Sequence, residues 1–466
     1  MAGSELTEIS GVEAGRLIRA GKLSPVELTQ AYLDRIERLD GRLNAFAHVM
    51  AESARAAARD RETEARNGGI RGPLHGVPVA VKDLCDTDNA PTAAGFPMFR
   101  NRRSRANATI VDRIAAAGAV LIGKTELSEG ALAIHHPDVA LPVNPWRGDL
   151  WTGSSSSGSG VAAAAGFCAA AVGTDTGGSI RFPAICNAVV GVKPTWGRVS
   201  RHGVFPLSWT LDHVGPLARR VEDAAALLGA IAGRDDRDAT SLSAPVPDYL
   251  AELDHGLGGV RLGFDAAYSS DGVMTETVAA LQAAIAVLTG RRAKLVSVTM
   301  PDTAAAQSAW TPICLSEALS VHQGLEGARP EGYSALFRDF LDAGAAVTGV
   351  DYAQANLARR QFAGNLDALF ETVDLMLVPV TPNPVPTVEE FARICPDPAG
   401  LERLIRFTCV YDVSGHPTIT LPAGLSAGGE PIAFQLVGPR LSEALLIRAG
   451  YAWQQDFGWD NRPPLG

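Results

Sequence analysis

Residues 152–182 read TGSSSSGSGVAAAAGFCAAAVGTDTGGSIRF and carry three signals in one stretch. A Ser- and Gly-rich loop comes first, an apolar run at 161–172 follows, and Ser179 ends a second Gly-rich segment. The apolar run is shorter than the ~20 residues that cross a bilayer, and it predicts a buried helix that leads into a short strand before Thr174. A Ser after Gly-Gly is often only a helix N-cap, so the stretch alone leaves the role of Ser179 open.

The flanking sequence alternates predicted helices with predicted strands. Ser24 and Pro25 mark the start of one helix, as N-cap and first helical residue, and a second helix is expected over roughly 44–66. Two apolar segments predict buried strands. The apolar part of VPVAVKDL ends at Lys82, and that of AVLIGKTELSEG runs into Lys124. Alternation of this kind predicts an α/β fold, a single large domain with a mixed twisted β-sheet covered by helices on both faces. Further helices are predicted to end at Gly118 and to cover 221–233, 275–289 and 351–371. Further strands are predicted at 260–264, 293–298, 374–382, 417–424 and 432–438.

Composition narrows the class of protein. The chain has 466 residues, is 46% hydrophobic and carries a formal net charge of −10, which argues against binding to nucleic acid or to an anionic membrane. Its six cysteines form no CxxC pair, so neither a zinc knuckle nor a redox dithiol is expected. Sparse cysteines and an N-terminus, MAGSELTEIS, without an apolar core predict a cytoplasmic protein with no signal peptide.

The sequence contains none of the common catalytic motifs sought around Ser179 or elsewhere. The sequence around Ser179 is not a G-x-S-x-G elbow, and the chain contains neither an H-E-x-x-H motif nor a Walker loop. His135 and His136 are adjacent, and on a strand they would point to opposite faces, which disfavours shared metal ligation. Taken singly, a Gly/Ser loop is usually a turn, and a Lys after an apolar strand usually lies at a solvated strand end.

In combination, and in this order, the segments resemble the amidase signature family. The matching blocks are GPLHGVPVAVKDLCDTDNAPTAAG, GKTELSEGA, NPW, GSSSSGSGVAAAAG, TDTGGSIRFPA and GVKPTWGRVSRHGVFPLSWTLDHVGPLAR, with DLMLVPVTP, SGHPTITLPAG and PIAFQLVGP near the C-terminus. The resemblance extends from about residue 10 to residue 455. It implies one amidase domain over 1–466, with N-terminal helices in 1–66, the signature core in 70–220, and the remaining sheet, helices and pocket segments in 221–466.

The resemblance also assigns catalytic roles. It implies that Ser179 is the nucleophile, that Ser155 relays protons after a cis Ser154–Ser155 bond, and that Lys82 is the base. A hydroxyl needs a base to become a good nucleophile, and burial after an apolar strand lowers the pKa of a lysine enough for it to serve. The backbone amides of Thr176, Gly177 and Gly178, together with that of Ser179, are expected to form an oxyanion hole. Asp175 and Arg181 are expected to hold this turn rather than to touch substrate.

The substrate is less well determined by sequence. Segments 127–143 and 310–345 are expected to supply the pocket walls. Two departures from the family pattern are noted: Ser154 and Ser157 stand where glycines are common, and Glu126 stands where an Asn is common. The pocket residues predicted are Leu127, Ile134, Trp209, Trp310 and Phe337, with Tyr333 and Phe340 as further aromatic candidates, although such aromatics are at least as often core residues.

We expect hydrolysis of small or aryl carboxamides, with anilides, esters and carbamates or urethanes as secondary substrates, and no metal or organic cofactor. The resemblance suggests a homodimer, a small-molecule amide as the partner, and neither nucleic acid nor membrane. The alternative function is a glutaminase subunit of the amidotransferase A type that works with partner subunits. The segment LAIHHPDVALPVN departs from that branch. A binding protein on an enzyme-derived scaffold is a third hypothesis, which the three filled catalytic positions disfavour.

Overall fold

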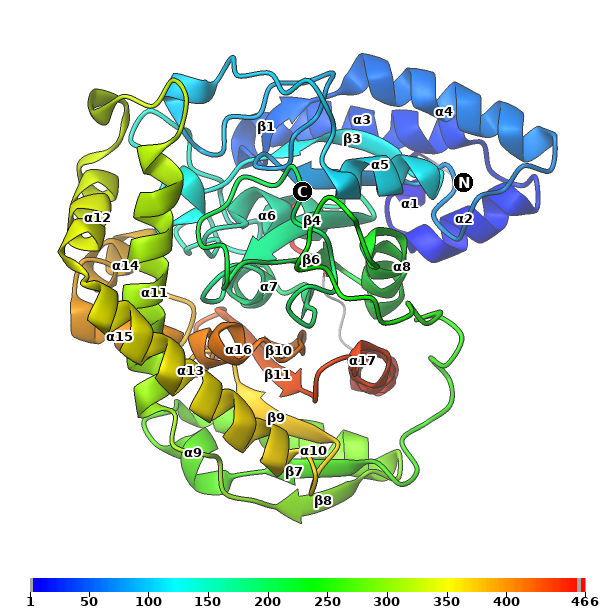
Figure 1. Cartoon of the computed structure of the whole chain (residues 1–466). Coiled ribbons are helices and arrows are strands. Elements are labelled where there is room, and N and C mark those ends of the chain that lie inside the picture. The colour runs from blue at the N-terminus through cyan, green and yellow to red at the C-terminus, as the bar shows by residue number, and fades with distance from the viewer. Residues whose placement is uncertain (1–2, 459–461, 466) are drawn as a thin grey trace.

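The computed structural model describes residues 3–458 and 462–465, and its centre is one mixed β-sheet of eleven strands (Figure 1). The strand order is β1-β3-β2-β4-β6-β5-β10-β11-β9-β7-β8. This arrangement confirms the predicted mixed sheet. The strands are β1 (Phe46–Val49), β2 (Pro78–Lys82), β3 (Val120–Thr125), β4 (Ala170–Asp175), β5 (Val190–Lys193), β6 (His213–Ala218), β7 (Arg261–Phe264), β8 (Lys294–Ser297), β9 (Leu375–Pro379), β10 (Thr418–Leu425) and β11 (Pro431–Val437).

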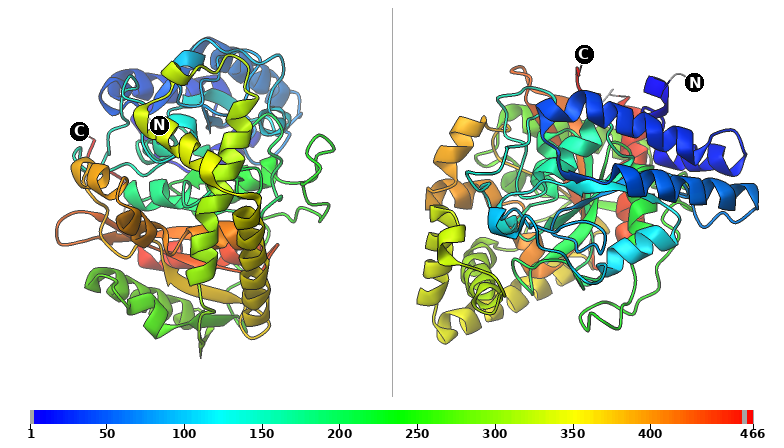
Figure 2. Two further views of the ribbon diagram at one scale, coloured as in Figure 1. Left: turned by 60° about the vertical axis from the view of Figure 1, so that its left-hand side comes forward. Right: turned by 90° about the horizontal axis from the view of Figure 1, so that it is seen from above.

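Helices surround the sheet, and Figure 2 shows them on both of its sides. The N-terminal helices lie at one end of the molecule, and α11 and α13 lie side by side at another edge. The helices are α1 (Gly3–Leu6), α2 (Gly11–Arg19), α3 (Pro25–Leu43), α4 (Ala51–Arg66), α5 (Thr109–Ala116), α6 (Ser157–Ala164), α7 (Arg181–Cys186), α8 (Val221–Ile231), α9 (Ala266–Ser270), α10 (Thr275–Gly290), α11 (Ala304–Gln323), α12 (Ala335–Ala346), α13 (Gly349–Leu369), α14 (Val388–Ile394), α15 (Pro398–Ile405), α16 (Cys409–Ser414) and α17 (Glu443–Phe457).

The central strands bring segments that are distant in the sequence to one edge of the sheet. Strand β2 is parallel to both β3 and β4, and every residue of β2 and β4 is buried. Strands covered on both faces are continuous apolar runs, as these are. Because parallel strands end at the same edge, Lys82 at the end of β2 lies beside Thr174 near the end of β4.

Two predicted helices differ from the structure. Ser24 does cap α3 through the amides of Val26 and Glu27, but the helix expected at 44–66 is shorter than predicted. Asn44 adopts a left-handed conformation that ends α3, the short strand β1 follows, and α4 begins only at Ala51. In the apolar run 161–172, α6 ends at Ala164, a turn occupies 165–169, and β4 begins at Ala170, so the predicted helix is shorter and the strand before Thr174 longer than expected.

Candidate active site

Lys82 lies at the end of β2 with no exposed surface, and its ammonium group contacts hydroxyl oxygens. Its Nζ donates to Ser155 Oγ at 2.7 Å and to Thr174 Oγ1 at 2.8 Å. No carboxylate forms an ion pair with Lys82 in the described part of the chain. Burial lowers the pKa of Lys82 to about 7, although the negative charges of Asp212 and Asp175 oppose this shift. A neutral amine is therefore accessible near neutral pH.

The Ser-rich loop is held by side chains of its own and by neighbouring strands. The peptide bond between Ser154 and Ser155 is cis, as the resemblance implies. Ser156 Oγ donates to the Thr174 carbonyl and accepts from the Thr174 amide, both at 3.1 Å, which ties the loop to β4. The hydroxyl of Ser157, one of the two departures from the family pattern, lies 2.9 Å from His135 Nε2.

The turn that carries Ser179 is fixed from within by Asp175. Asp175 Oδ1 accepts from the Gly178 amide at 2.6 Å, and Asp175 Oδ2 accepts from the Ile180 amide at 2.9 Å. Arg181, fully buried, donates to both Asp175 oxygens and to Asp412. Burial alone would raise the pKa of Asp175, but the charge and hydrogen bonds of Arg181 hold it well below its ordinary value. Arg181 thus lies behind the turn, paired with carboxylates.

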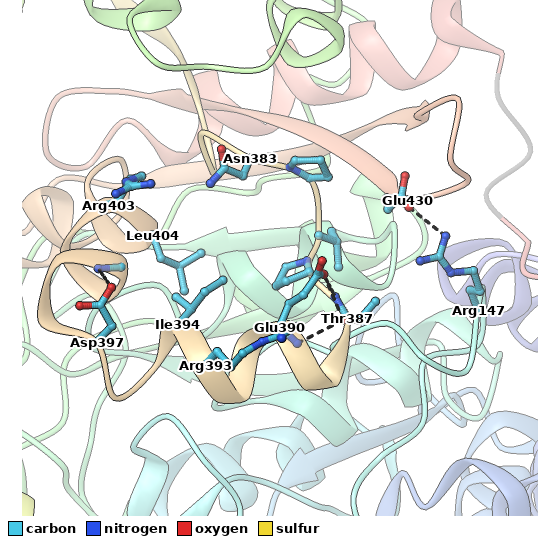
Figure 3. Close-up of a pocket in the computed structure, with 14 residues that line it drawn as sticks. Arg147, Asn383, Thr387, Glu390, Arg393, Ile394, Asp397, Arg403, Leu404 and Glu430 are labelled. Atoms are coloured by element: carbon cyan, nitrogen blue, oxygen red, sulfur yellow. Dashed lines mark hydrogen bonds and ion pairs between the residues drawn. The ribbon is translucent and has the colours of Figure 1, made fainter.

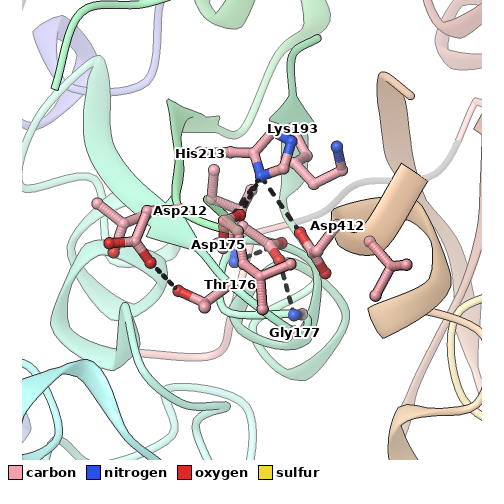
Figure 4. A network of polar contacts seen from close by, with 12 residues as sticks. Asp175, Thr176, Gly177, Lys193, Asp212, His213 and Asp412 are labelled. Carbon is pink, nitrogen blue, oxygen red and sulfur yellow. Dashed lines mark hydrogen bonds and ion pairs between the residues drawn. The ribbon is translucent and has the colours of Figure 1, made fainter. Parts of the chain in front are cut away.

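Figure 4 shows the buried polar network around this turn, in which His213 faces Asp412 and Thr176 faces Asp212. His213 Nδ1 lies 3.4 Å from Asp412 Oδ1, and Thr176 Oγ1 donates to Asp212 Oδ1 at 2.6 Å. Burial raises the pKa of Asp212 to about 6, and the hydrogen bond from Thr176 opposes that rise. The network contacts the turn through the side chain of Thr176.

The two glycines of the turn are sterically required. Gly178 has φ of +140°, and a Cβ there would lie 2.4 Å from the Phe182 ring. A Cβ on Gly177 would lie 2.9 Å from the ring of Trp310. The Gly178 amide, predicted as an oxyanion donor, donates to Asp175 Oδ1 in this structure. Thr176, Gly177 and Ser179 remain as candidate donors.

The predicted pocket residues lie in different surroundings. Leu127 has no exposed surface, and Ile134 is half-buried against the core. Trp209 is 55% exposed, whereas Trp310 is half-buried and lies against Gly177. Phe337 is buried in an aromatic cluster, so it packs as a core residue does. That cluster contains Phe96, Phe99, Phe205, His322, Tyr333, Phe337 and Phe340.

Sequence reasoning missed three residues that contact the site. Thr174 supplies the second acceptor for Lys82, Asp212 binds the side chain of Thr176, and Thr408 Oγ1 donates to the Gly177 carbonyl at 2.6 Å. Thr174 and Asp212 lie inside matched family blocks, so their position was a usable signal. Thr408 lies 231 residues from Gly177, and no local pattern marks it.

A separate recess of about 610 Å³ lies between α14, α15 and the loop 383–387 (Figure 3). Arg147 and Glu430 pair across one end of it at 2.8 Å. Behind α14, the ring of Trp151 stacks on Phe391 with centroids 3.9 Å apart, and its centroid lies 5.7 Å from that of Phe182. None of the three predicted catalytic residues is among the described residues that line it.

Other features of the described residues bear on function. No three His, Cys, Asp or Glu side chains among residues 3–458 and 462–465 are grouped to hold a metal ion. All six cysteines are buried and unpaired. Within those same residues, no helix combines the length and apolar character needed to cross a membrane.

Comparison with known proteins decides the family. A family model described as Amidase matches residues 27–447. The chain belongs to the amidase family. The protein named amidase AmiD of Mycobacterium tuberculosis is 43% identical over 461 residues, which cover 99% of this chain and 95% of the relative. The A-type component of the glutamyl-tRNA(Gln) amidotransferase of Halorhodospira halophila is 36% identical, over 97% and 98% of the two chains.

A solved amidase shares the architecture. The native peptide amidase of Stenotrophomonas maltophilia superposes with a TM-score of 0.83 at 33% identity, covering 98% of each chain. The amidase-family chain described here is therefore a hydrolase of carbon–nitrogen bonds other than peptide bonds, with the fold of its relatives.

Proposed function

We propose that this amidase-family chain hydrolyses small or aryl carboxamides through an acyl-enzyme on Ser179. Ser179 Oγ attacks the carbonyl carbon, and its proton passes through Ser155 to Lys82. Collapse of the tetrahedral intermediate breaks the C–N bond, and the leaving amine takes the proton. Water then attacks the ester on Ser179 and releases the acid, with proton transfer through the same groups.

The observation that carries this proposal is the 2.7 Å contact between Lys82 Nζ and Ser155 Oγ in a fully buried setting. A buried lysine bound to hydroxyls rather than to a carboxylate loses its proton near neutral pH, so it can accept one from Ser155. Ser155 both donates and accepts, which suits a relay. The amides of Thr176, Gly177 and Ser179 are the proposed oxyanion donors.

Anilides, activated esters and carbamates fit the same chemistry, because each presents a carbonyl with a leaving amine or alcohol. A hydrolysis panel of aliphatic amides, anilides, esters and carbamates tests the proposal. Turnover of at least one aryl amide is expected, with Ser179→Ala inactive and fully folded. An active Ser179→Ala variant would refute the nucleophile.

The second candidate is a glutaminase subunit of an amidotransferase, which the 36% identity with the Halorhodospira protein favours. Glutamine hydrolysis in the presence of a partner subunit, with no turnover of aryl amides, would select this function. We place the amidase first, because the AmiD relative is more similar over the same length. A cytoplasmic location and a homodimer remain predictions, which fractionation and light scattering would check.

A further inference from the structure

The carbonyl groups of Thr176, Gly177 and Gly178 each accept a hydrogen bond from a donor outside the turn or in the helix that follows. Trp310 Nε1 donates to the Thr176 carbonyl at 2.7 Å. Thr408 Oγ1 donates to the Gly177 carbonyl at 2.6 Å, and the Phe182 amide donates to the Gly178 carbonyl at 2.7 Å. The orientation of each peptide plane is thereby set by an identifiable contact.

The orientation of a carbonyl also fixes the amide that follows it. In a trans peptide unit the C=O and the next N–H point in nearly opposite directions. Trp310 therefore holds the Gly177 N–H away from the indole, on the far side of the Thr176–Gly177 peptide. The Gly178 N–H is already bound to Asp175, so the Gly177 amide matters more for the oxyanion than the sequence predicted.

We propose that Trp310 is a positioning residue for the oxyanion-binding amide of Gly177, an inference that rests on the proposed function. Trp310 acts through the peptide plane that its indole N–H anchors. Its ring also lies 2.9 Å from the position that a Cβ on Gly177 would take, so the packing and the hydrogen bond act on neighbouring parts of the same turn.

Helix α11 also binds the loop that holds the Thr176 side chain. Glu317, about two turns further along α11, accepts from Ser208 Oγ at 2.6 Å and from the Thr210 amide at 2.9 Å. The same loop carries Asp212, which binds the Thr176 hydroxyl. Thr176 is thus held at its carbonyl by α11 and at its side chain by a loop that α11 anchors.

Trp310→Phe tests the proposal, because it removes the N–H donor and retains an aromatic ring. We expect kcat for the best amide to fall about 10- to 100-fold, less than the ~10²–10³-fold that accompanies loss of a direct oxyanion donor. KM is expected to stay within about twofold, because the Gly177 amide that Trp310 positions acts mainly on the oxyanion of the transition state. The rate at which a fluorophosphonate labels Ser179 should fall in the same proportion, and the pH midpoint of kcat should not move.

Trp453→Phe is the matched control. The Trp453 indole donates to the Pro422 carbonyl at 2.9 Å from a buried position on α17, so this variant loses the same type of bond elsewhere. It should lose thermal stability and keep kcat. If Trp310→Phe does not fold, benzothienylalanine at position 310 removes only the N–H and carries the same expectation.

Wild-type kcat in a folded Trp310 variant, or an equal loss of kcat in the Trp453 control, would overturn the positioning role. Both outcomes leave labelling of Ser179 intact and so leave the proposed function standing. An active Ser179→Ala variant would instead overturn the proposed function itself. The two failures are therefore distinguishable.

Discussion

Two fully buried lysines occupy neighbouring parallel strands and have different partners. Lys124, on β3, lies 2.8 Å from the Asp83 carboxylate and donates to the Pro91 carbonyl. Lys82, on β2, instead contacts the hydroxyls of Ser155 and Thr174. Both side chains have no exposed surface, so burial alone does not distinguish them.

The partner determines what a buried lysine can do. A carboxylate at hydrogen-bond distance stabilises the ammonium form, which makes Lys124 one half of a structural ion pair. Hydroxyls compensate a charge less, so the desolvation of Lys82 lowers its pKa to about 7. The same residue type, one strand apart, is thereby suited to structure in one case and to proton transfer in the other.

The largest expected effect is the loss of activity in Lys82→Met. Removal of a general base costs about 10²–10⁴-fold in rate, so kcat/KM for the best amide should fall by that factor or more. Circular dichroism should show a native fold, because Met replaces a buried cation by an apolar chain of similar length. Lys82→Met with more than a tenth of wild-type activity would contradict the proposed base.

Lys124→Met should act mainly on stability. It leaves the Asp83 carboxylate buried without its cation, and breaking such a pair costs about 3–5 kcal/mol. Urea denaturation at pH 7 measures the loss in the free energy of unfolding. The double variant Lys124→Met with Asp83→Leu is the control, since removal of both charges should recover much of that loss. A single variant as stable as wild type would show that the two lysines are not distinguished by their partners.

The hydroxyl beside Lys82 supplies a sharper contrast within one segment. Ser155→Ala removes the proposed relay and should lower kcat about 100-fold or more. Ser159→Ala is the matched control, because Ser159 is equally buried but binds Thr125 and the Val172 carbonyl rather than Lys82. We expect it to lose about 1 kcal/mol of stability and to keep kcat within about threefold. Equal losses of kcat would remove the special role of Ser155.

The sign of the pH dependence of stability follows from the pKa of Lys82. Lysine titrates near ~10.4 in an unfolded polypeptide, whereas Lys82 titrates near 7 when folded. Between those values the unfolded state holds the extra proton, so folding is favoured as pH rises. Lys82→Met should therefore gain stability over wild type at pH 7, and that gain should shrink toward pH 10. A difference that stays constant across this range would contradict the lowered pKa.

The sequence predicted the elements that a hydrophobic periodicity or a short motif marks. The cap at Ser24, the buried strands ending near Lys82 and Lys124, and the cis Ser154–Ser155 bond all match the structure. It did not predict β1, because four residues with no alternating burial carry too little signal. A helix leading into a strand before Thr174 was predicted, but the boundary between them was misplaced, because a fully buried strand and a buried helix have the same apolar composition.

Contacts across the chain were beyond local reasoning. Trp310 reaches Thr176 over 134 residues, and only the packing of α11 against the turn brings them together. Trp310 was predicted as a pocket wall from its residue type, and the structure places it on the backbone of the turn. Phe337, predicted on the same grounds, lies within a cluster of aromatic rings. Residue type alone could not separate these two positions.

Titration of the lysine side chains by NMR tests the central claim most directly. With lysine labelled at Cε, we expect two resonances with midpoints near 7, because burial also lowers the pKa of Lys193 to about 7. In Lys82→Met one of these two should disappear, which assigns it to Lys82. If the resonance lost in Lys82→Met titrates near 10.5 in the wild-type protein, Lys82 is charged at neutral pH and the proposed base is contradicted.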